Sequence, residues 1–262
     1  MAEALAELTS AVAEVTREAA AMAFARWRTD FARWEKTPGS PVCEVDLDVD
    51  RMLRARLGAL LPDAGWLSEE TVDSPERLGR SQVWVVDPID GTRDYIRGRD
   101  GWCVSIALVE NGRPVFAVLD APARRESWVA KAGRGAWRNG VALAVGDRVE
   151  LAGTRVPADA LPKADRDFVL VDKPNSIALR IAMVAADEAD LVATLRWGNE
   201  WDIAAAVLVA SEAGAGVSDA LGQPLSFNKP DPRAFGVLVA APGIQQAAIA
   251  RLDERARTLS AG

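Results

Sequence analysis

Apolar residues at helical spacing alternate along the chain with short apolar runs, which predicts a mixture of helices and strands. The Ala-rich segment 3–29 predicts a long helix. A second, amphipathic helix is expected to begin near Asp48 and to be stopped by Pro62. Between the two helices, the segment from Lys36 is expected to be a loop that leads into an extended piece. The sequence AGWLSEE (64–70) then predicts a short strand that ends in two acids.

Antiparallel strands dominate the rest of the first half. SQVWVVD (81–87) predicts a buried strand, and WCVSIALVENGRPVFAVLDAP (102–122) predicts a hairpin. The two apolar runs of this hairpin are joined by an Asn-Gly pair, which supplies the positive φ that a tight hairpin turn requires. ESWVAKAGRGAWRNG (126–140) is expected to continue the meander.

The second half alternates between predicted strands and helices. Strands are expected in DFVLVD (167–172), DLVATLRW (190–197) and FGVLVAAP (235–242). Helices are expected in SIALRIAMVAADEA (176–189), WDIAAAVLVASEAGA (201–215) and the last twenty residues. This order predicts an α/β half, from about 151 to 262, that packs on an α+β half, from about 1 to 150. Because no linker is long enough to free the halves, we expect a single domain over 1–262.

Composition excludes several classes of protein. The chain contains no histidine, so Ser-His-Asp catalysis and His-rich zinc sites are excluded. The formal net charge of −7 argues against a nucleic-acid partner, because such binding needs a basic face. Cys43 and Cys103 are too few for a disulfide framework, and we expect them to be reduced thiols in the core. The N-terminus lacks an apolar signal sequence, and no uncharged run is continuous enough to span a membrane, so we expect a cytoplasmic protein.

Two acids lie close together after the buried strand, in VWVVDPIDGTRDYI (83–96). Asp87 ends the apolar run, and Asp90 is expected to point back toward the same space. Two such carboxylates repel each other unless a cation lies between them, and ligand sets made of oxygen alone favour Mg²⁺. Gly91 and Thr92 follow where a helix is expected to begin, so their N–H groups could face an anion. The alternative is an Asx turn that Asp90 caps.

Three further acidic segments lie at the ends of predicted elements, and each also has a structural interpretation. Glu69 and Glu70 could be a solvated surface pair, and Asp202 could be the N-cap of the apolar helix that follows it. EVDLDVD (44–50) contains the Asp-x-Asp pattern of haloacid-dehalogenase-type phosphatases, but charged Glu44 stands where that motif requires an apolar strand. The segment also lacks the glycine of a calcium-binding loop.

These acidic segments, taken in their order along the chain, resemble the inositol monophosphatase superfamily of metal-dependent, lithium-sensitive phosphomonoesterases. The similar segments are EVDLDVDRML, WLSEET, WVVDPIDGTRDYI, CVSIALVENGRPVFAVLDAP and WDIAAAVLVASEAGA. The resemblance covers nearly the whole chain and implies a layered α/β/α/β/α sandwich. It also implies a homodimer, a small phosphorylated substrate and two or three Mg²⁺ ions, for which Mn²⁺ could substitute.

The resemblance implies roles for individual residues as well. The carboxylate ligands of the metal ions would be Glu69, Asp87, Asp90 and Asp202. The backbone carbonyl of Ile89 would join them. Glu69 would also count among the catalytic residues with Asp46 and Thr92, the pair that would orient and deprotonate the attacking water. The backbone at Gly91 and Thr92 would hold the phosphate.

DPIDGTRDYI is more similar to the 3'(2'),5'-bisphosphate nucleotidase branch than to inositol monophosphatases, which usually have Asn-Phe after an uncharged residue. That branch implies 3'-phosphoadenosine 5'-phosphate as the substrate. Candidates for its second phosphate are Arg93, Arg97, Lys173 and Arg180, and each could instead be an ordinary surface charge. Ser176 is a further substrate-binding candidate, although NSIALR (175–180) replaces the Gly and Lys of the usual Gly-Ser-x-x-x-Lys with Asn and Arg.

Two alternative functions stay open. One is an inositol-1-monophosphatase or another sugar-phosphate phosphatase of the same fold. The other is a non-catalytic protein that binds phosphate or a nucleotide, which would be expected to lack a metal ligand. None of the predicted ligands is missing from the sequence.

Overall fold

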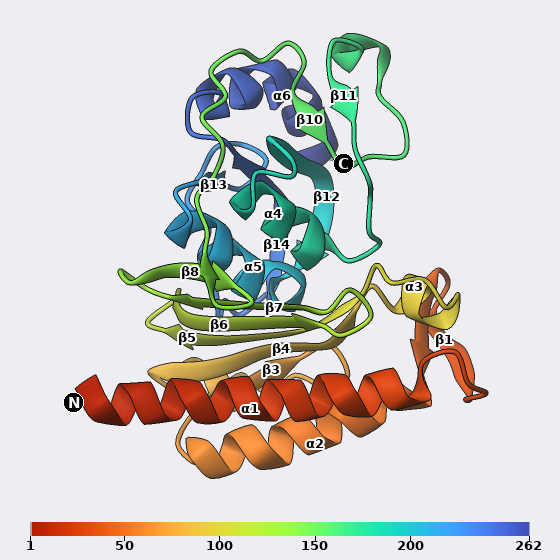
Figure 1. Cartoon of the computed structure of the whole chain (residues 1–262), viewed down its shortest axis with the longest axis vertical. Helices are drawn as coiled ribbons and strands as arrows, with labels where there is room; N and C mark the ends of the chain where they lie inside the picture. Colours follow the sequence, from red (N-terminus) through yellow and green to blue (C-terminus); the bar gives the residue numbers. More distant parts are fainter. Residues whose placement is uncertain (1, 262) are drawn as a thin grey trace.

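Helices α1 (Ala2–Arg26) and α2 (Glu44–Leu60) form the first layer of the molecule, below a large sheet (Figure 1). The structure is a computed structural model that describes residues 2–261, with side chains from residue 7 onward. The apolar residues predicted on one face of α2 include Val49, Leu53 and Leu57, and all three are fully buried. The helix therefore forms because its apolar stripe packs on α1 and on the sheet above.

The second layer is a sheet of seven strands, with the order β3-β4-β5-β6-β7-β8-β9. Its strands are β3 (Gly65–Ser68), β4 (Gln82–Asp90), β5 (Cys103–Glu110), β6 (Arg113–Ala121), β7 (Glu126–Lys131), β8 (Gly135–Arg138) and β9 (Val141–Ala142). The strand β3 runs parallel to β4, and each later pair is antiparallel. Asn111 (φ 49°) and Gly112 (φ 78°) form the predicted tight turn between β5 and β6.

Three more layers complete the stack in Figure 1. Helices α4 (Ile177–Ala185) and α5 (Glu200–Glu212) cover the other face of the large sheet. A second sheet has the order β12-β14-β13, with antiparallel pairs of β12 (Leu191–Asn199), β14 (Arg233–Ala240) and β13 (Gly216–Ser218). Helix α6 (Gln245–Ser260) packs on its outer face. This arrangement confirms the predicted α/β/α/β/α sandwich.

The predicted strand in DFVLVD is much shorter than expected. Only β11 (Val169–Leu170) forms, and it pairs in parallel with β10 (Arg155–Val156). The side chains of Val169 and Leu170 are exposed, because no layer covers this part of the chain. The 3₁₀ helix η2 (Lys163–Asp165) lies in the loop between the two short strands.

The segment from Lys36 was predicted to be a loop that leads into an extended piece; the extended piece forms as a strand, and an unpredicted strand precedes it to make a hairpin. Strands β1 (Arg33–Thr37) and β2 (Ser40–Cys43) pair in an antiparallel manner. The following helix also begins earlier than Asp48, at Glu44. The carboxylate of Asp46 accepts a 2.8 Å hydrogen bond from the backbone N–H of Cys43, which caps the helix at this earlier position.

Strand β4 continues through the acids that were expected to follow it. It ends at Asp90 rather than at Asp87, with an irregular register against β5 between these two residues. Gly91 then adopts φ 97° and precedes the predicted short helix α3 (Thr92–Ile96). A Cβ at Gly91 would lie 2.5 Å from the backbone oxygen of Gly101, so only glycine fits this turn.

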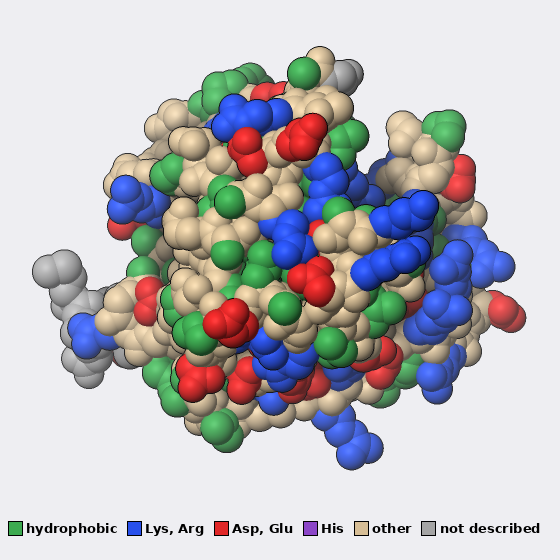
Figure 2. Space-filling view, turned by 90° about the horizontal axis from the view of Figure 1, so that it is seen from above, with side chains coloured by type: hydrophobic (Ala, Val, Ile, Leu, Met, Phe, Trp, Pro, Cys, Tyr) green, Lys and Arg blue, Asp and Glu red, His purple; other side chains and the backbone are tan. Residues whose placement is uncertain are grey.

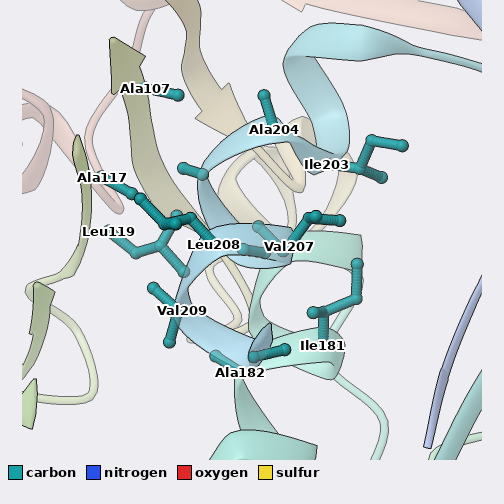
Figure 3. Close-up of a cluster of buried hydrophobic side chains, with 14 of the residues drawn as sticks. Ala107, Ala117, Leu119, Ile181, Ala182, Ile203, Ala204, Val207, Leu208 and Val209 are labelled. Carbon is teal, nitrogen blue, oxygen red and sulfur yellow. The ribbon is translucent and has the colours of Figure 1, made fainter. Parts of the chain in front are cut away.

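The core between the two sheets is built around α5 (Figure 3). Nine residues of this helix are buried. Leu208 and Val209 belong to the same cluster as Leu119 from the large sheet. Both halves of the chain thus contribute to one core, in which α5 packs on β4, β5, β6 and β7. Among the described helices, none combines the length and the apolar character that crossing a membrane would take.

Candidate active site

Three carboxylates converge where strands β3 and β4 end and α5 begins. Oxygen atoms of Glu69, Asp87 and Asp202 all lie within 4.8 Å of one another. The parallel pairing of β3 with β4 brings the first two together, because Ser68 is in register with Val86. Asp202 joins them from the first turn of α5, where it also accepts a 3.1 Å hydrogen bond from the backbone N–H of Asn199. The predicted ligands therefore form a cluster of oxygen donors alone, which suits Mg²⁺.

Asp90 faces the same cavity as these three residues but is also tied to α4. Its Oδ2 accepts hydrogen bonds from the hydroxyl of Ser176 (2.5 Å) and the backbone N–H of Ala178 (2.7 Å). These donors fix the carboxylate at the edge of the cluster. Its second oxygen makes no hydrogen bond with the described part of the protein.

The pKa values of these carboxyl groups show how strongly the cluster demands positive charge. Burial raises the pKa of Asp87 well above its ordinary value, and the charges of Glu69 and Asp90 raise it further. Burial and the same two neighbours raise the pKa of Asp202 to about 8. For Asp90, burial raises the pKa to about 6, although the bonds from Ser176 and Ala178 oppose the shift. A divalent cation among these groups would remove the repulsion.

Lys36 supplies one positive charge to this cluster. Its ammonium nitrogen lies 2.8 Å from Oε1 of Glu69 and 2.9 Å from Oε1 of Glu70. Burial disfavours the charged ammonium group, but the two glutamates outweigh it and raise the pKa of Lys36. The β1–β2 hairpin thus places a cation on a predicted metal ligand. Sequence reasoning missed this contact, because a single lysine in a polar segment carries no distinguishing signal.

The predicted pair of Asp46 and Thr92 is also brought together. Oγ1 of Thr92 lies 3.3 Å from Oδ1 of Asp46 and 3.0 Å from the carbonyl oxygen of Ile89, so its single proton can be donated to either. Burial raises the pKa of Asp46 to about 6, although bonds from Cys43 oppose this. Asp46 is almost fully buried and does not line the cavity, whereas Thr92 does. Thr92 therefore stands between Asp46 and the cavity.

The cavity above the carboxylates has a volume of about 520 Å³. Gly91 and Thr92 line it from the start of α3, and four basic side chains line it elsewhere: Arg93, Lys173, Arg180 and Arg196. Figure 2 shows Lys and Arg side chains gathered toward one edge of the upper face, on the side where Figure 1 draws α3 and β1. An acidic protein thus gathers four basic side chains, which we call the basic wall, in the cavity that its carboxylates line.

The four basic residues differ in how they are held. Arg93 donates to the carbonyl of Gly39, and Lys173 pairs with Asp159. Arg180 donates from Nε and Nη2 to the carbonyls of Ser176 (3.3 Å) and Asn175 (3.2 Å).

Arg196 was not predicted from the sequence, where it is one charged residue in a strand. Its guanidinium makes no hydrogen bond or ion pair with the described residues, although it is close enough to Arg180 to lower that side chain's pKa together with burial. Unlike the other three basic residues, it has no hydrogen-bonding or ion-pair partner among the described residues, which leaves its guanidinium available to an anion.

Two predicted substrate residues are placed elsewhere. Arg97 is exposed and lies outside the cavity lining. Ser176 is fully buried behind Asp90, and its hydroxyl already donates to Asp90 and accepts from the backbone N–H of Leu179. The expectation that Ser176 contacts the substrate is therefore corrected. The structure gives it a part in orienting Asp90.

Comparison with known proteins finds one family and several similar proteins. A family model described as the inositol monophosphatase family matches residues 4–257. The chain is 36% identical over 195 residues to the Nus factor SuhB of Xylella fastidiosa, covering 68% of this chain and 69% of the relative. It is 31% identical over 203 residues to the 3'(2'),5'-bisphosphate nucleotidase CysQ of Escherichia coli, covering 73% of this chain and 81% of the relative.

The fold is shared with solved structures as well. The IMPase of Thermotoga maritima superposes with a TM-score of 0.80 at 26% sequence identity, covering 95% of this chain and 97% of that one. The similar segments thus extend over the residues that build the cavity.

Proposed function

The chain belongs to the inositol monophosphatase family of metal-dependent phosphomonoesterases, and on that premise we propose that it hydrolyses the 3'-phosphate of 3'-phosphoadenosine 5'-phosphate. The observation that carries this proposal is that four basic side chains line the same cavity as the carboxylate cluster. A phosphate that is cleaved at the metal cluster needs few of them, because the metal ions neutralise its charge. A second phosphate on the same substrate would use the rest.

We propose that Glu69, Asp87, Asp90 and Asp202 hold two or three Mg²⁺ ions, with the carbonyl of Ile89 as a further ligand. The support is the all-oxygen donor set, the raised pKa values of Asp87, Asp90 and Asp202, and the attraction of the Lys36 ammonium to Glu69. Mn²⁺ suits the same donors. When bound, such ions polarise the phosphoryl oxygens and lower the pKa of the attacking water.

The residues around the cluster would position the water and accept its proton. The Thr92 hydroxyl faces the cavity and contacts Asp46, so a proton taken from water can pass through Thr92 to the buried carboxylate. A pKa of about 6 keeps Asp46 mostly ionised at neutral pH, as a general base requires. Glu69, as a proposed ligand, would help to hold the ion that activates this water. The backbone at Gly91 and Thr92 would hold the phosphate at the first turn of α3.

The second phosphate would bind the basic wall. Arg180 and Arg196 stand close together, and an anion between two guanidinium groups relieves their repulsion. Arg93 and Lys173, which line the same cavity, would also take part. The similarity to a relative named 3'(2'),5'-bisphosphate nucleotidase supports this substrate. The similarity to a solved IMPase supports the inositol-phosphate alternative.

A panel of phosphate esters tests the proposal. At equal Mg²⁺, we expect kcat/KM for 3'-phosphoadenosine 5'-phosphate to exceed that for inositol 1-phosphate. The reverse order would assign the protein to the sugar-phosphate phosphatases. No turnover of any ester with Mg²⁺ or Mn²⁺ would favour the non-catalytic alternative. Arg196→Gln should raise KM for the bisphosphate, while Arg97→Gln serves as a matched control outside the cavity.

We also propose that residues 1–262 act as one catalytic domain, and that the protein is a cytoplasmic homodimer. The shared core around α5 supports the first point. Cys43 and Cys103 are free and buried, as expected for a reducing compartment. Sedimentation of the purified protein would test for the dimer.

A further inference from the structure

A second, smaller cavity of about 230 Å³ adjoins the cavity of the metal cluster. The two cavities share Arg180 and Leu195 in their walls. Its lining is mainly apolar and includes Val156, Pro157, Leu161, Phe168, Leu191 and Ala193. We call this space the apolar chamber. It lies under the segment that joins β10 to β11, beside the edge strand β12.

Two charged residues of the apolar chamber are already paired with each other. Asp165 and Arg255 both line it, and an oxygen of Asp165 lies 2.7 Å from Nη2 of Arg255. Arg251 also lies 3.7 Å from Asp165 and has its guanidinium carbon 5.4 Å from the centre of the Phe168 ring. Apart from Arg180, the charged side chains of the lining are therefore paired, and most of the other lining residues are apolar, including the ring of Phe168.

Arg180 connects the apolar chamber with the basic wall of the metal cavity. Two of its nitrogens are held by the carbonyls of Asn175 and Ser176 at the start of α4, which fixes the side chain in the shared wall. A ligand that reached from one cavity into the other would pass Arg180. Its phosphate would stay with the guanidinium groups, and its apolar part would enter the chamber.

We propose that the apolar chamber binds the aromatic base of a bisphosphorylated nucleoside whose phosphates occupy the metal cavity. This inference rests on the proposed function and specifies where the base of its substrate binds. A cyclic polyol such as inositol carries a hydroxyl on every ring carbon, so burying it in apolar surroundings leaves hydroxyls unpaired, which is unfavourable. An aromatic base has hydrogen-bonding groups only along its edge, and its two flat faces gain from contact with the aliphatic side chains and the ring of Phe168. The chamber thus favours a nucleotide over a cyclic polyol phosphate.

Ala193→Phe is the variant that tests this inference. Ala193 lines the apolar chamber from β12 and is itself exposed, so a larger side chain can enter the chamber without disturbing the core. Ala142→Phe adds the same bulk at an exposed strand position outside both cavities and is the matched control. The substrates are 3'-phosphoadenosine 5'-phosphate and the same sugar bisphosphate with a tetrahydrofuran ring and no base.

In the unmodified protein, the base should improve kcat/KM by about 10- to 100-fold, the benefit of burying an aromatic group. In Ala193→Phe the ratio of kcat/KM with the base to kcat/KM without it should fall toward one, whereas Ala142→Phe should leave this ratio unchanged. A ratio that is unchanged in Ala193→Phe would overturn the inference, as would a ratio near one in the unmodified protein.

A second measurement separates this inference from the proposed function. Adenosine 5'-phosphate and ribose 5-phosphate are compared as competitive inhibitors of p-nitrophenyl phosphate hydrolysis, which needs no bisphosphate substrate. If bisphosphates are not hydrolysed, the proposed function fails, yet tighter inhibition by the adenosine compound that is lost in Ala193→Phe would still support a base in the chamber. Equal inhibition by the two compounds in the unmodified protein would overturn the inference on its own.

Discussion

The hydroxyl of Ser176 donates a 2.5 Å hydrogen bond to Oδ2 of Asp90, and this bond joins the first turn of α4 to the end of β4. The backbone N–H of Ala178 donates to the same oxygen at 2.7 Å. One oxygen of Asp90 is thus fixed by the fold, which leaves the other for a metal ion. A residue that is 86 positions away in the chain therefore orients a predicted ligand.

Ser176→Ala should weaken both the fold and metal binding. The substitution removes the hydroxyl donor from a largely buried carboxylate, which costs about 1–3 kcal/mol in the free energy of unfolding. The affinity for Mg²⁺ should fall about 10-fold or more, since groups that orient a ligand typically contribute that much. Urea denaturation and isothermal titration with Mg²⁺ measure the two effects.

Ser211→Ala is the control for this experiment. The Ser211 hydroxyl donates to the carbonyl of Leu208 at 3.2 Å within α5, far from the first turn that carries Asp202. It should leave Mg²⁺ affinity unchanged. Unfolding and titration curves of Ser176→Ala that match those of the unmodified protein would refute the role given to this bond.

Asp202→Asn should affect activity and metal-free stability in opposite directions. It removes a predicted Mg²⁺ ligand, so kcat should fall at least about 100-fold, and Asp90→Asn should behave alike. Circular dichroism should show an intact fold in both variants. Turnover near that of the unmodified protein in either one would contradict the metal assignment.

The stability effect follows from the raised pKa of Asp202. Its folded-state pKa of about 8 lies above the ordinary 3.8, so the folded protein binds more protons than the unfolded chain between these values. Stability therefore falls as pH rises through this window, and the loss is complete only above about pH 8. With a chelator present, the Tm should decrease from pH 6 to pH 9, and less steeply in Asp202→Asn. Added Mg²⁺ should restore the Tm of the unmodified protein. Equal slopes with and without the substitution would exclude this explanation.

Lys36→Gln should strengthen Mg²⁺ binding in the absence of substrate. The ammonium group occupies the space beside Glu69 and Glu70, and an incoming cation must displace or tolerate it. Removing the positive charge lowers this cost, so the Kd for Mg²⁺ should decrease. Arg33→Gln, on the same exposed strand but with no ion pair to the described residues, is the control. A weaker or unchanged Kd in Lys36→Gln would show that the lysine does not compete with the metal.

Hydrophobic periodicity predicted most of the fold, because the buried strands and helices carry unbroken apolar patterns. The turn at Asn111 and Gly112 is an example, since its residues can adopt only a few conformations. The β1 strand was missed for the opposite reason: all five of its residues are exposed, so no apolar pattern marks it. Its pairing with β2 is visible only once the chain has folded.

The metal cluster was predictable for a different reason than the basic wall. Glu69, Asp87 and Asp202 occur in motifs whose spacing is shared within the family, and the fold brings them together as expected. Arg196 occurs in no such motif, and whether a charged strand residue faces solvent or a cavity depends on packing. For Ser176 the motif predicted a contact with substrate, but the side chain is buried behind the predicted ligand Asp90.

The last prediction concerns the hydroxyl of Thr92, which lies 3.3 Å from Asp46 and lines the cavity. If a proton passes through this hydroxyl, Thr92→Val should lower kcat by about 100-fold or more, within the range of general-base catalysis. Thr92→Ser keeps the hydroxyl and should retain most of the activity. The Mg²⁺ affinity should change little in either variant, because the Thr92 side chain is not among the proposed ligands.

The dependence of kcat/KM on pH gives a second readout. The acidic limb near pH 6, set by Asp46, should persist in Thr92→Ser and flatten in Thr92→Val. Equal activity in the valine and serine variants would mean that the threonine is structural and that the proton takes another path.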